Sequence, residues 1–204
     1  MMNALSFLAN PTAVPPPTFF GKFDVMTTQQ SDPHQNAEAL NSQTVEVQNN
    51  LGGFVFKRSE AIVFPYGMVG FANARNFGIV GLEDLVPGGG FHLLQCLDQT
   101  NLSFIVLPRG LENEFVAASD ALDACNQMGF DKDSSLLLFI LTLRRDPETA
   151  TTSMSLNVRA PVLVNGAQRL GRQHVFTNPN YEVRLPLNLS PEPSSKEEMG
   201  GSHG

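Results

Sequence analysis

The stretch "SLNVRAPVLVNGAQRLGRQHVF" (Ser155–Phe176) carries the clearest structural signals in this sequence. In its first part, apolar and polar residues alternate as they do in a β-strand with one buried face. Pro161 then removes a backbone donor, so it belongs at a bend or at a sheet edge. A second apolar run leads to Asn165-Gly166, a pair that tight turns favour because both residues tolerate positive φ. The stretch therefore predicts a bent strand followed by its own hairpin partner.

The same stretch gathers amide and arginine side chains into a compact block, for which two explanations are open. In the first, Asn157, Asn165 and Gln173 form hydrogen bonds that fix the bend and the register of the hairpin. We expect Gly171 to mark a bulge there. In the second, the exposed row Asn157, Arg159 and Gln173 faces a protein partner at a strand edge. We favour the first explanation, with Asn157 the best candidate for both roles.

Short apolar runs of the same kind recur on both sides of this stretch. Turn-forming residues separate them, and Asp98–Asn101 is a connection of hairpin length. The run Leu136–Leu143 has polar residues at both ends, which favours a strand buried at the centre of a sheet. The predicted strands cover residues 54–57, 61–64, 76–80, 91–97, 102–107, 136–143, 154–159, 162–164, 170–176 and 181–185.

One segment beginning at Ser119 carries helix signals instead. Ser119 is a suitable N-cap, and Gly129 stands where the helix would end. Leu122, Cys125 and Met128 recur every third residue and would form one apolar stripe. The predicted fold is therefore mainly β: a small antiparallel β-barrel-like domain with one short helix, flanked by disordered tails.

Composition sets the limits of the folded domain. Residues 1–52 are rich in Pro, Gln, Asn, Ser and Thr, and residues 188–204 are similar. Such segments bury too little apolar surface to offset the entropy lost on ordering. We predict a disordered N-terminal extension over residues 1–52, a β domain over residues 53–187 and a disordered C-terminal tail over residues 188–204.

The charge distribution argues against nucleic acid as a partner. The chain has a formal net charge of −7; residues 51–187 hold 11 basic and 13 acidic residues, so the flanks carry −5 of the total. A nearly neutral domain has no basic surface for a phosphate backbone, and we expect no direct nucleic-acid contact. Acidic flanks suit a basic protein partner instead.

Neither a membrane span nor a signal peptide is predicted. No apolar run approaches the roughly 18 residues that a membrane-spanning helix needs. The stretch "ALSFLA" near the N-terminus has no preceding Lys or Arg, which argues against a secretory signal. We therefore expect a cytoplasmic protein in which Cys96 and Cys125 are reduced, buried thiols.

No residue pattern indicates catalysis, a cofactor site or a metal site. His92 and His174 fall on predicted strands, where a structural or exposed role is the expectation. "DKDSS" (Asp131–Ser135) begins like a calcium loop, but the twelfth position is Thr142 instead of Glu. We expect no catalytic residue, no cofactor and no metal ligand in this chain, and thus no enzyme.

Three blocks follow one another in the chain: "FPYGMVGFANARNFGIV" (Phe64–Val80), "FHLLQCLDQTNLSFIVLP" (Phe91–Pro108) and the stretch quoted first. Together, in this order, they resemble the flagellar assembly factor FliW family. The resemblance covers about residues 60–187. The matching residues are Phe64, Gly67, Gly70, Phe71, Gln95, Phe104, Pro108, Gly129, Asn157, Ala160, Pro161, Asn165, Gly171 and Gln173.

The resemblance implies a small cytoplasmic β-barrel-like protein that regulates by switching partners and has no catalytic activity. In the family, flagellin sequesters the protein; once flagellin is exported, the protein binds the translational regulator CsrA and relieves the repression of flagellin synthesis. The candidate partner-binding residues are Phe71, Asn157, Arg159 and Gln173. The candidate structural residues are Gly67, Gly70, Pro161, Asn165, Gly166 and Gly171.

Two other classes of function remain open at this point. A β-barrel ligand-binding or carbohydrate-binding module would fit the strand pattern, although the chain contains no Trp to stack on a sugar. A small enzyme would need His92 or His174 beside an acidic residue in a pocket.

Overall fold

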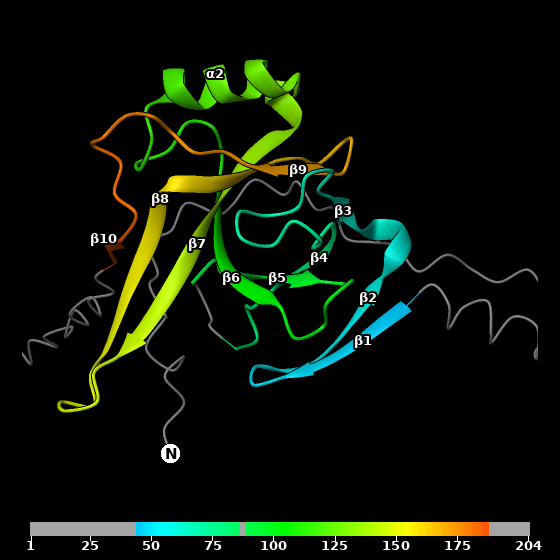
Figure 1. Cartoon of the computed structure of the whole chain (residues 1–204), viewed down its shortest axis with the longest axis vertical. Coiled ribbons are helices and arrows are strands. Elements are labelled where there is room, and N and C mark those ends of the chain that lie inside the picture. Colours follow the sequence, from blue (N-terminus) through cyan, green and yellow to red (C-terminus); the bar gives the residue numbers. More distant parts are fainter. Residues whose placement is uncertain (1–43, 86–88, 188–204) are drawn as a thin grey trace, which may run out of the picture.

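The computed structural model describes residues 44–85 and 89–187, and seven of its strands close into a barrel (Figure 1). The strand order is β8-β7-β6-β5-β4-β3-β9, and β9 pairs with β8 to close the ring. All pairings are antiparallel except the one between β3 and β9. The barrel strands are β3 (Ile62–Val63), β4 (Asn76–Gly81), β5 (His92–Cys96), β6 (Ser103–Arg109), β7 (Ser135–Arg145), β8 (Thr152–Asn165) and β9 (Leu170–Gln173).

Six further elements surround the barrel. A hairpin of β1 (Thr44–Asn49) and β2 (Gly52–Lys57) forms a separate two-stranded sheet, and β10 (Leu185–Pro186) pairs with the outer edge of β8. Helix α2 (Ala118–Met128) packs on the outside of the barrel, and the 3-10 turns η2 (Arg58–Glu60) and η3 (Lys132–Ser134) precede β3 and β7 (Figure 1). The predicted mainly β, barrel-like fold with one short helix is confirmed.

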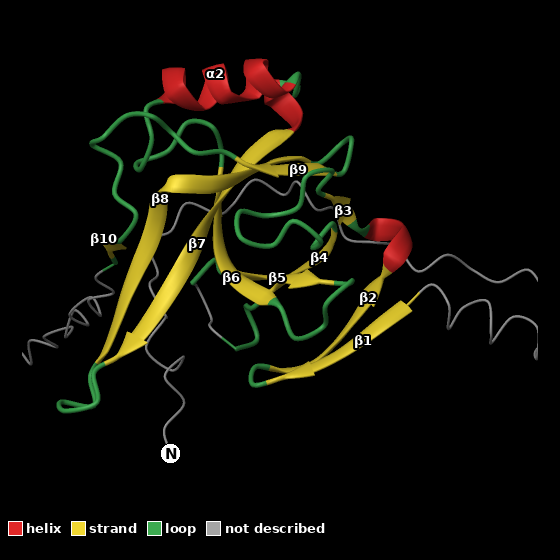
Figure 2. Ribbon diagram, in the orientation of Figure 1, coloured by secondary structure: helices red, strands yellow, loops and turns green. Residues whose placement is uncertain are grey.

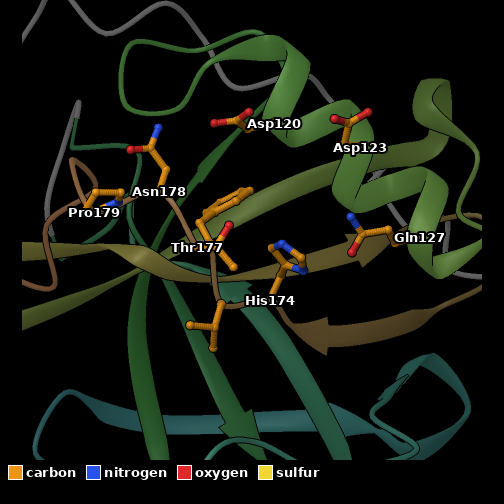
Figure 3. A pocket seen from close by; sticks show the side chains of 9 residues that line it. Asp120, Asp123, Gln127, His174, Thr177, Asn178 and Pro179 are labelled. Atoms are coloured by element: carbon orange, nitrogen blue, oxygen red, sulfur yellow. The ribbon is translucent and has the colours of Figure 1, made fainter.

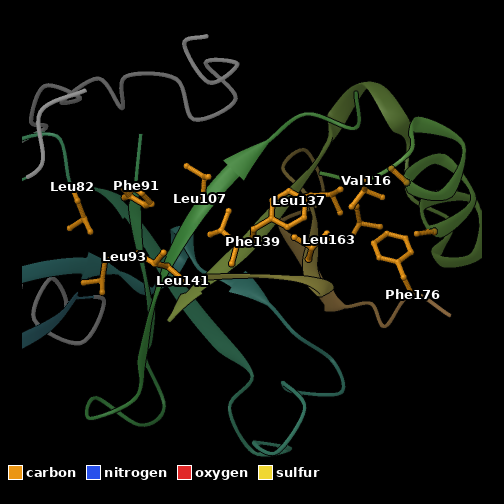
Figure 4. Close-up of a cluster of buried hydrophobic side chains, with 14 of the residues drawn as sticks. Leu82, Phe91, Leu93, Leu107, Val116, Leu137, Phe139, Leu141, Leu163 and Phe176 are labelled. Atoms are coloured by element: carbon orange, nitrogen blue, oxygen red, sulfur yellow. The ribbon is translucent and has the colours of Figure 1, made fainter. Parts of the chain in front are cut away.

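Two apolar clusters, one inside the barrel wall and one outside it, explain the buried run in β7. Leu136 and Leu138 point into the lumen, whereas Leu137 and Phe139 belong to the outer cluster (Figure 4). Because successive residues of a strand face opposite sides, a strand covered on both sides must be apolar throughout. The predicted central strand is thus confirmed, and Cys96 and Cys125 are buried in different clusters.

The predicted start of the domain at residue 53 is wrong. Residues 44–49 form β1, whose Val47 is buried and whose whole length pairs with β2. On β2, Phe56 packs over Gly78 of β4; a Cβ on Gly78 would come within 2.3 Å of the Phe56 ring. Burial of alternate residues against the barrel orders this strand despite its polar neighbours. The rest of both predicted tails, residues 1–43 and 188–204, lies outside the described residues.

Helix α2 begins and packs differently from the sequence prediction. Ala117 is the N-cap residue, so Ser119 lies inside the first turn, whereas the predicted end at Gly129 is correct. Leu122 is exposed, and the buried face consists of Ala121, Ala124 and Cys125. Small residues on that face let the helix approach the barrel closely, so the predicted Leu122-Cys125-Met128 stripe is only partly correct.

The bend at Pro161 is confirmed, although β8 continues through it. Leu138 of β7 pairs with Val162 and Ile140 pairs with Asn157, so residues 158–161 lie opposite a single β7 residue. This bulge lets β8 leave β7 and turn toward β9.

The turn after β8 differs from the prediction. Residues 166–169 form a four-residue loop, in which the positive φ of 51° belongs to Arg169 and not to Asn165 or Gly166. Asn165 is buried, and its side-chain oxygen accepts a hydrogen bond from the Gln168 N–H at 2.8 Å, which closes the loop without a left-handed residue at its start.

Gly171 does not mark a bulge; it pairs in regular register with Val164. The glycine is required because the ring of Phe64 lies directly on it: a Cβ at residue 171 would come within 2.5 Å of the ring. Phe64 is fully buried and also packs against Phe77, with ring centroids 4.7 Å apart. The ring therefore has no space into which it can withdraw.

We predict that Gly171→Ala destabilises the fold by about 1–3 kcal/mol, because the added methyl group overpacks the lumen at this contact. Chemical denaturation measures the effect. Gly110→Ala is the matched control, since the nearest atom to its added Cβ is 3.8 Å away. Adding Phe64→Leu to Gly171→Ala should restore part of the loss. Equal stabilities for Gly171→Ala and the wild type would refute the assigned role of this contact.

Candidate binding surface

The loop between β3 and β4, residues 64–75, lies across one mouth of the barrel (Figure 2). Its buried residues Phe64, Met68 and Ala74 belong to the lumen cluster. Its other apolar residues, among them Tyr66, face solvent. Packing against the lumen cluster thus fixes one side of the loop, and the opposite side presents apolar side chains to solvent.

A tight turn at the tip of the loop sets the direction of the exposed residues. Met68 and Phe71 pair through both backbone groups, with N···O distances of 3.2 and 2.8 Å. Gly70 lies between them with φ of 84°, the left-handed value that the third residue of such a turn adopts. At Gly67, with φ of 68°, a Cβ would come within 2.5 Å of the Phe71 carbonyl oxygen. Both predicted structural glycines therefore serve this turn.

Gln173 connects the loop to the bend of β8. Its side-chain oxygen accepts a hydrogen bond from the Val69 N–H at 3.0 Å, and its side-chain nitrogen donates to the Ala160 carbonyl at 3.0 Å. The Ala160 N–H in turn donates to the side-chain oxygen of Asn157 at 2.9 Å. The structure thus joins Asn157, Gln173 and the loop that carries Phe71 in one chain of hydrogen bonds, as the first explanation expects.

Four exposed apolar side chains on β3 and this loop form what we call the mouth patch: Val63, Tyr66, Val69 and Phe71, which are 40%, 73%, 67% and 41% exposed. Phe71 is held from below by an edge contact with Phe104, with ring centroids 6.0 Å apart. Large exposed apolar residues that lie together mark interaction surfaces more often than single ones do.

Arginines border the mouth patch. The guanidinium of Arg172 lies over the Tyr66 ring, 5.1 Å from its centroid. Arg169 is the last residue of the loop before β9 and lies beside β3. Its carbonyl oxygen accepts a hydrogen bond from the Val63 N–H, and its side chain donates a hydrogen bond to the Ser59 carbonyl. The patch is therefore apolar at its centre and basic along this border.

Arg159 lies apart from the mouth patch and anchors the segment before β10. Its guanidinium donates to the carbonyls of Tyr181 and Pro179 at 2.9 and 2.8 Å. The Tyr181 hydroxyl contacts Asp120 at 2.5 Å and accepts from the Ala117 N–H at 3.0 Å, which holds the start of α2. The structure therefore does not group Arg159 with Phe71.

A polar hollow of about 390 Å³ lies between α2 and the segment after β9 (Figure 3). It brings His174 near Asp120 and Asp123, the arrangement that a small enzyme would need. Asp120, however, is engaged by the Tyr181 hydroxyl, and the His174 ring packs edge-on against Phe176 at 4.7 Å. Among the described residues, no hydrogen bond joins His174 to a carboxylate, so this hollow holds no acid–base pair.

Burial lowers the pKa of both candidate histidines. Desolvation lowers the pKa of His92 below 6.5, and the Gly90 carbonyl and Glu83 only partly offset it. Desolvation and the neighbouring Arg172 charge lower the pKa of His174. The lowered pKa values favour the neutral form of both rings at neutral pH.

These lowered pKa values predict that stability falls as pH decreases from 7.5 to 5.5. The unfolded chain takes up protons near pH 6.5, above the folded-state pKa, so protonation favours unfolding. The double variant His92→Gln/His174→Gln should flatten the profile of unfolding free energy against pH, whereas His34→Gln should not. An unchanged slope in the double variant would contradict this assignment.

Neither a metal cluster nor a membrane helix is found in the described parts of the chain. Within residues 44–85 and 89–187, no three His, Cys, Asp or Glu side chains are grouped to hold a metal ion. Over the same residues, no helix has both the length and the apolar character needed to cross a bilayer.

The comparisons with known proteins agree with one another. The family model described as FliW protein matches residues 46–187. The chain belongs to the FliW family. It is 27% identical over 139 residues to the flagellar assembly factor FliW of Natranaerobius thermophilus, covering 68% of this chain and 88% of the relative. It is 30% identical to that of Clostridium botulinum strain Alaska E43, covering 65% of this chain and 90% of the relative.

A solved FliW structure supports the fold. The crystal structure of the flagellar assembly factor FliW superposes with a TM-score of 0.50 at 22% identity, covering 73% of this chain and 98% of the solved chain. The matched region starts within β1, so this strand, which the sequence prediction placed in the disordered extension, belongs to the FliW domain. Residues 1–45 precede that match.

Several residues of the mouth patch could not be identified from the sequence. The motif "FPYGMVGF" was recognised, but only Phe71 was assigned a binding role, because Tyr66 and Val69 cannot be told from buried loop residues by their apolar character.

We predict that Gln173→Ala lowers the melting temperature by about 2–6 °C, because it removes two hydrogen bonds worth roughly 1 kcal/mol in total. Differential scanning calorimetry measures this change. Gln127→Ala, at an exposed helix position, should leave the melting temperature unchanged. If Gln173→Ala melts like the wild type, the side chain does not fix the hairpin, and the partner-surface explanation gains support.

Proposed function

We propose that this chain is a cytoplasmic flagellar assembly factor that acts by binding and has no catalytic activity. Its partners are flagellin and the translational regulator CsrA: flagellin occupies the protein until it is exported, and the released protein then antagonises CsrA. The observation that carries the proposal is the FliW match over residues 46–187, which takes in nearly the full length of relatives named flagellar assembly factors.

The mouth patch supports a binding role for this domain. It offers two exposed aromatic rings, Tyr66 and Phe71, on a loop held by lumen packing and by Gln173. Rigid aromatic side chains bind partners at a low entropic cost, because little motion is lost on contact. In this proposal Phe71 touches the partner, Gln173 and Asn157 position the loop, and Arg159 contributes through the segment that it anchors.

A ligand-binding barrel is the weaker alternative. The lumen contains packed side chains: Phe64, Phe77, Leu94 and Leu138 are fully buried there. A barrel that carries a small ligand needs an internal cavity, and here aromatic and aliphatic side chains occupy that space. Binding at the outer surface therefore accounts better for the exposed apolar residues.

We predict that Tyr66→Ser/Val69→Ser weakens flagellin binding by about tenfold or more, since exposed aromatic and apolar anchors dominate such interfaces. Isothermal titration calorimetry measures the affinity. Val175→Ser/Val183→Ser, at sites 53% and 55% exposed and outside the mouth patch, is the matched control and should bind normally.

Excess flagellin should also reduce the amount of CsrA recovered with the protein. Binding of both partners with no mutual effect would reject the switching model.

A further inference from the structure

The N-terminal segment contains an aromatic cluster outside the matched FliW domain. Phe19, Phe20 and Phe23 lie within five residues, preceded by Pro15–Pro17. The following residues, 27–43, contain no aromatic residue and are rich in Gln, Asn, Ser and Thr. Exposure of aromatic rings to water is unfavourable, and their burial against another apolar surface lowers the free energy of the chain. We propose that residues 18–26 dock on the mouth patch of the same chain and cover it.

The connection has the right length for this contact. Thr44 pairs with Lys57, six residues before Val63, so residue 44 lies at most about 27 Å from the mouth patch, taking 3.6 Å per residue and one strand-pair spacing. The 17 residues from 27 to 43, taken as a flexible coil, have a root-mean-square length of about 21–25 Å. The linker is therefore long enough for the segment to reach the patch of its own chain.

The chemistry of the two surfaces is also complementary. The patch presents the Tyr66 and Phe71 rings, and aromatic pairs gain energy beyond the burial of their area. Arg172 borders the Tyr66 ring, and Asp24 directly follows the aromatic cluster. Within residues 18–26 the charges of Lys22 and Asp24 cancel, whereas residues 1–43 together hold one basic and three acidic residues, a net charge of −2, which favours their approach to this border.

Weak docking is sufficient to regulate the patch. A tether of this kind supplies an effective concentration of order 1 mM, so a contact with a dissociation constant of about 0.1 mM leaves the patch free about 10% of the time. The apparent affinity for a partner then falls by about tenfold. This regulatory consequence rests on the proposed function, but the docking itself does not.

Hydrogen exchange in the full chain tests the docking without any partner. The N–H groups of Gly67, Val69, Phe71 and Ala74 are hydrogen-bonded in the loop, so their exchange reports its opening. Phe19→Ser/Phe20→Ser/Phe23→Ser should speed exchange over residues 64–75 by about tenfold. The matched control Leu5→Ser/Phe7→Ser/Leu8→Ser removes three apolar residues from the same segment and should leave the exchange rates unchanged. Equal exchange in the wild type and the Phe triple variant overturns the proposal.

A reciprocal variant excludes indirect effects. In Tyr66→Ser/Val69→Ser the patch loses its anchors, so adding the Phe triple substitution should change the exchange of the loop no further. An additional effect in that background means that the aromatic cluster acts elsewhere and refutes the proposed docking site. Loop protection that rises with protein concentration, together with dimers in analytical ultracentrifugation, would assign the docking to a second copy and overturn the intramolecular form.

Flagellin titration separates the docking from the proposed function. The Phe triple variant should bind flagellin about tenfold more tightly than the wild type, while the Leu5/Phe7/Leu8 control matches the wild type. Faster loop exchange with unchanged flagellin affinity refutes the competition. If neither protein binds flagellin, the proposed function fails, and the exchange result alone decides whether the segment docks.

Discussion

The barrel depends on the contact between the Phe64 ring and Gly171 at its seam. Here β3 and β9 run parallel and share a single register pair, Val63 with Leu170, so backbone pairing alone joins the seam weakly. The ring lies so close to the backbone of β9 that any side chain at residue 171 would collide with it. Gln173, two residues further along β9, is thereby brought within reach of the loop that follows β3. Closure of the barrel and placement of the exposed loop thus have one cause.

A filled lumen moves function to the outer surface. Alternate residues of the wall strands occupy the interior so completely that Phe77 and Leu94 are inaccessible to solvent. The outer face is covered by α2 and by the β1–β2 hairpin (Figure 1). The exposed apolar side chains of the loop across the mouth lie outside this filled interior, on a loop held by lumen packing and by Gln173. A rigid scaffold with selective loops is a common way for a small β domain to bind other proteins.

Features that depend on neighbouring residues could be predicted from the sequence. Features that depend on contacts between distant residues could not. The central strand and the bend at Pro161 were correct, because burial on both faces and the missing donor are visible in neighbouring residues. The role of Gly171 was wrong, since its cause is a ring from a distant part of the chain. Residues 44–49 were assigned to the disordered tail because polar neighbours concealed a strand that only tertiary burial orders. Tyr66 was not identified because exposed positions within a loop follow no periodic pattern that can be read from the sequence.

The β1–β2 hairpin has a mechanical consequence for the chain that precedes it. The hairpin is a sheet of its own, seated on the barrel by side chains such as Phe56 over Gly78, whereas the barrel strands are joined by continuous backbone pairing. Force applied at the N-terminus, for example by an unfolding protease, would first peel away the hairpin, because side-chain contacts yield before a closed ring of strands opens. The hairpin would detach first, and the barrel would remain closed after its loss.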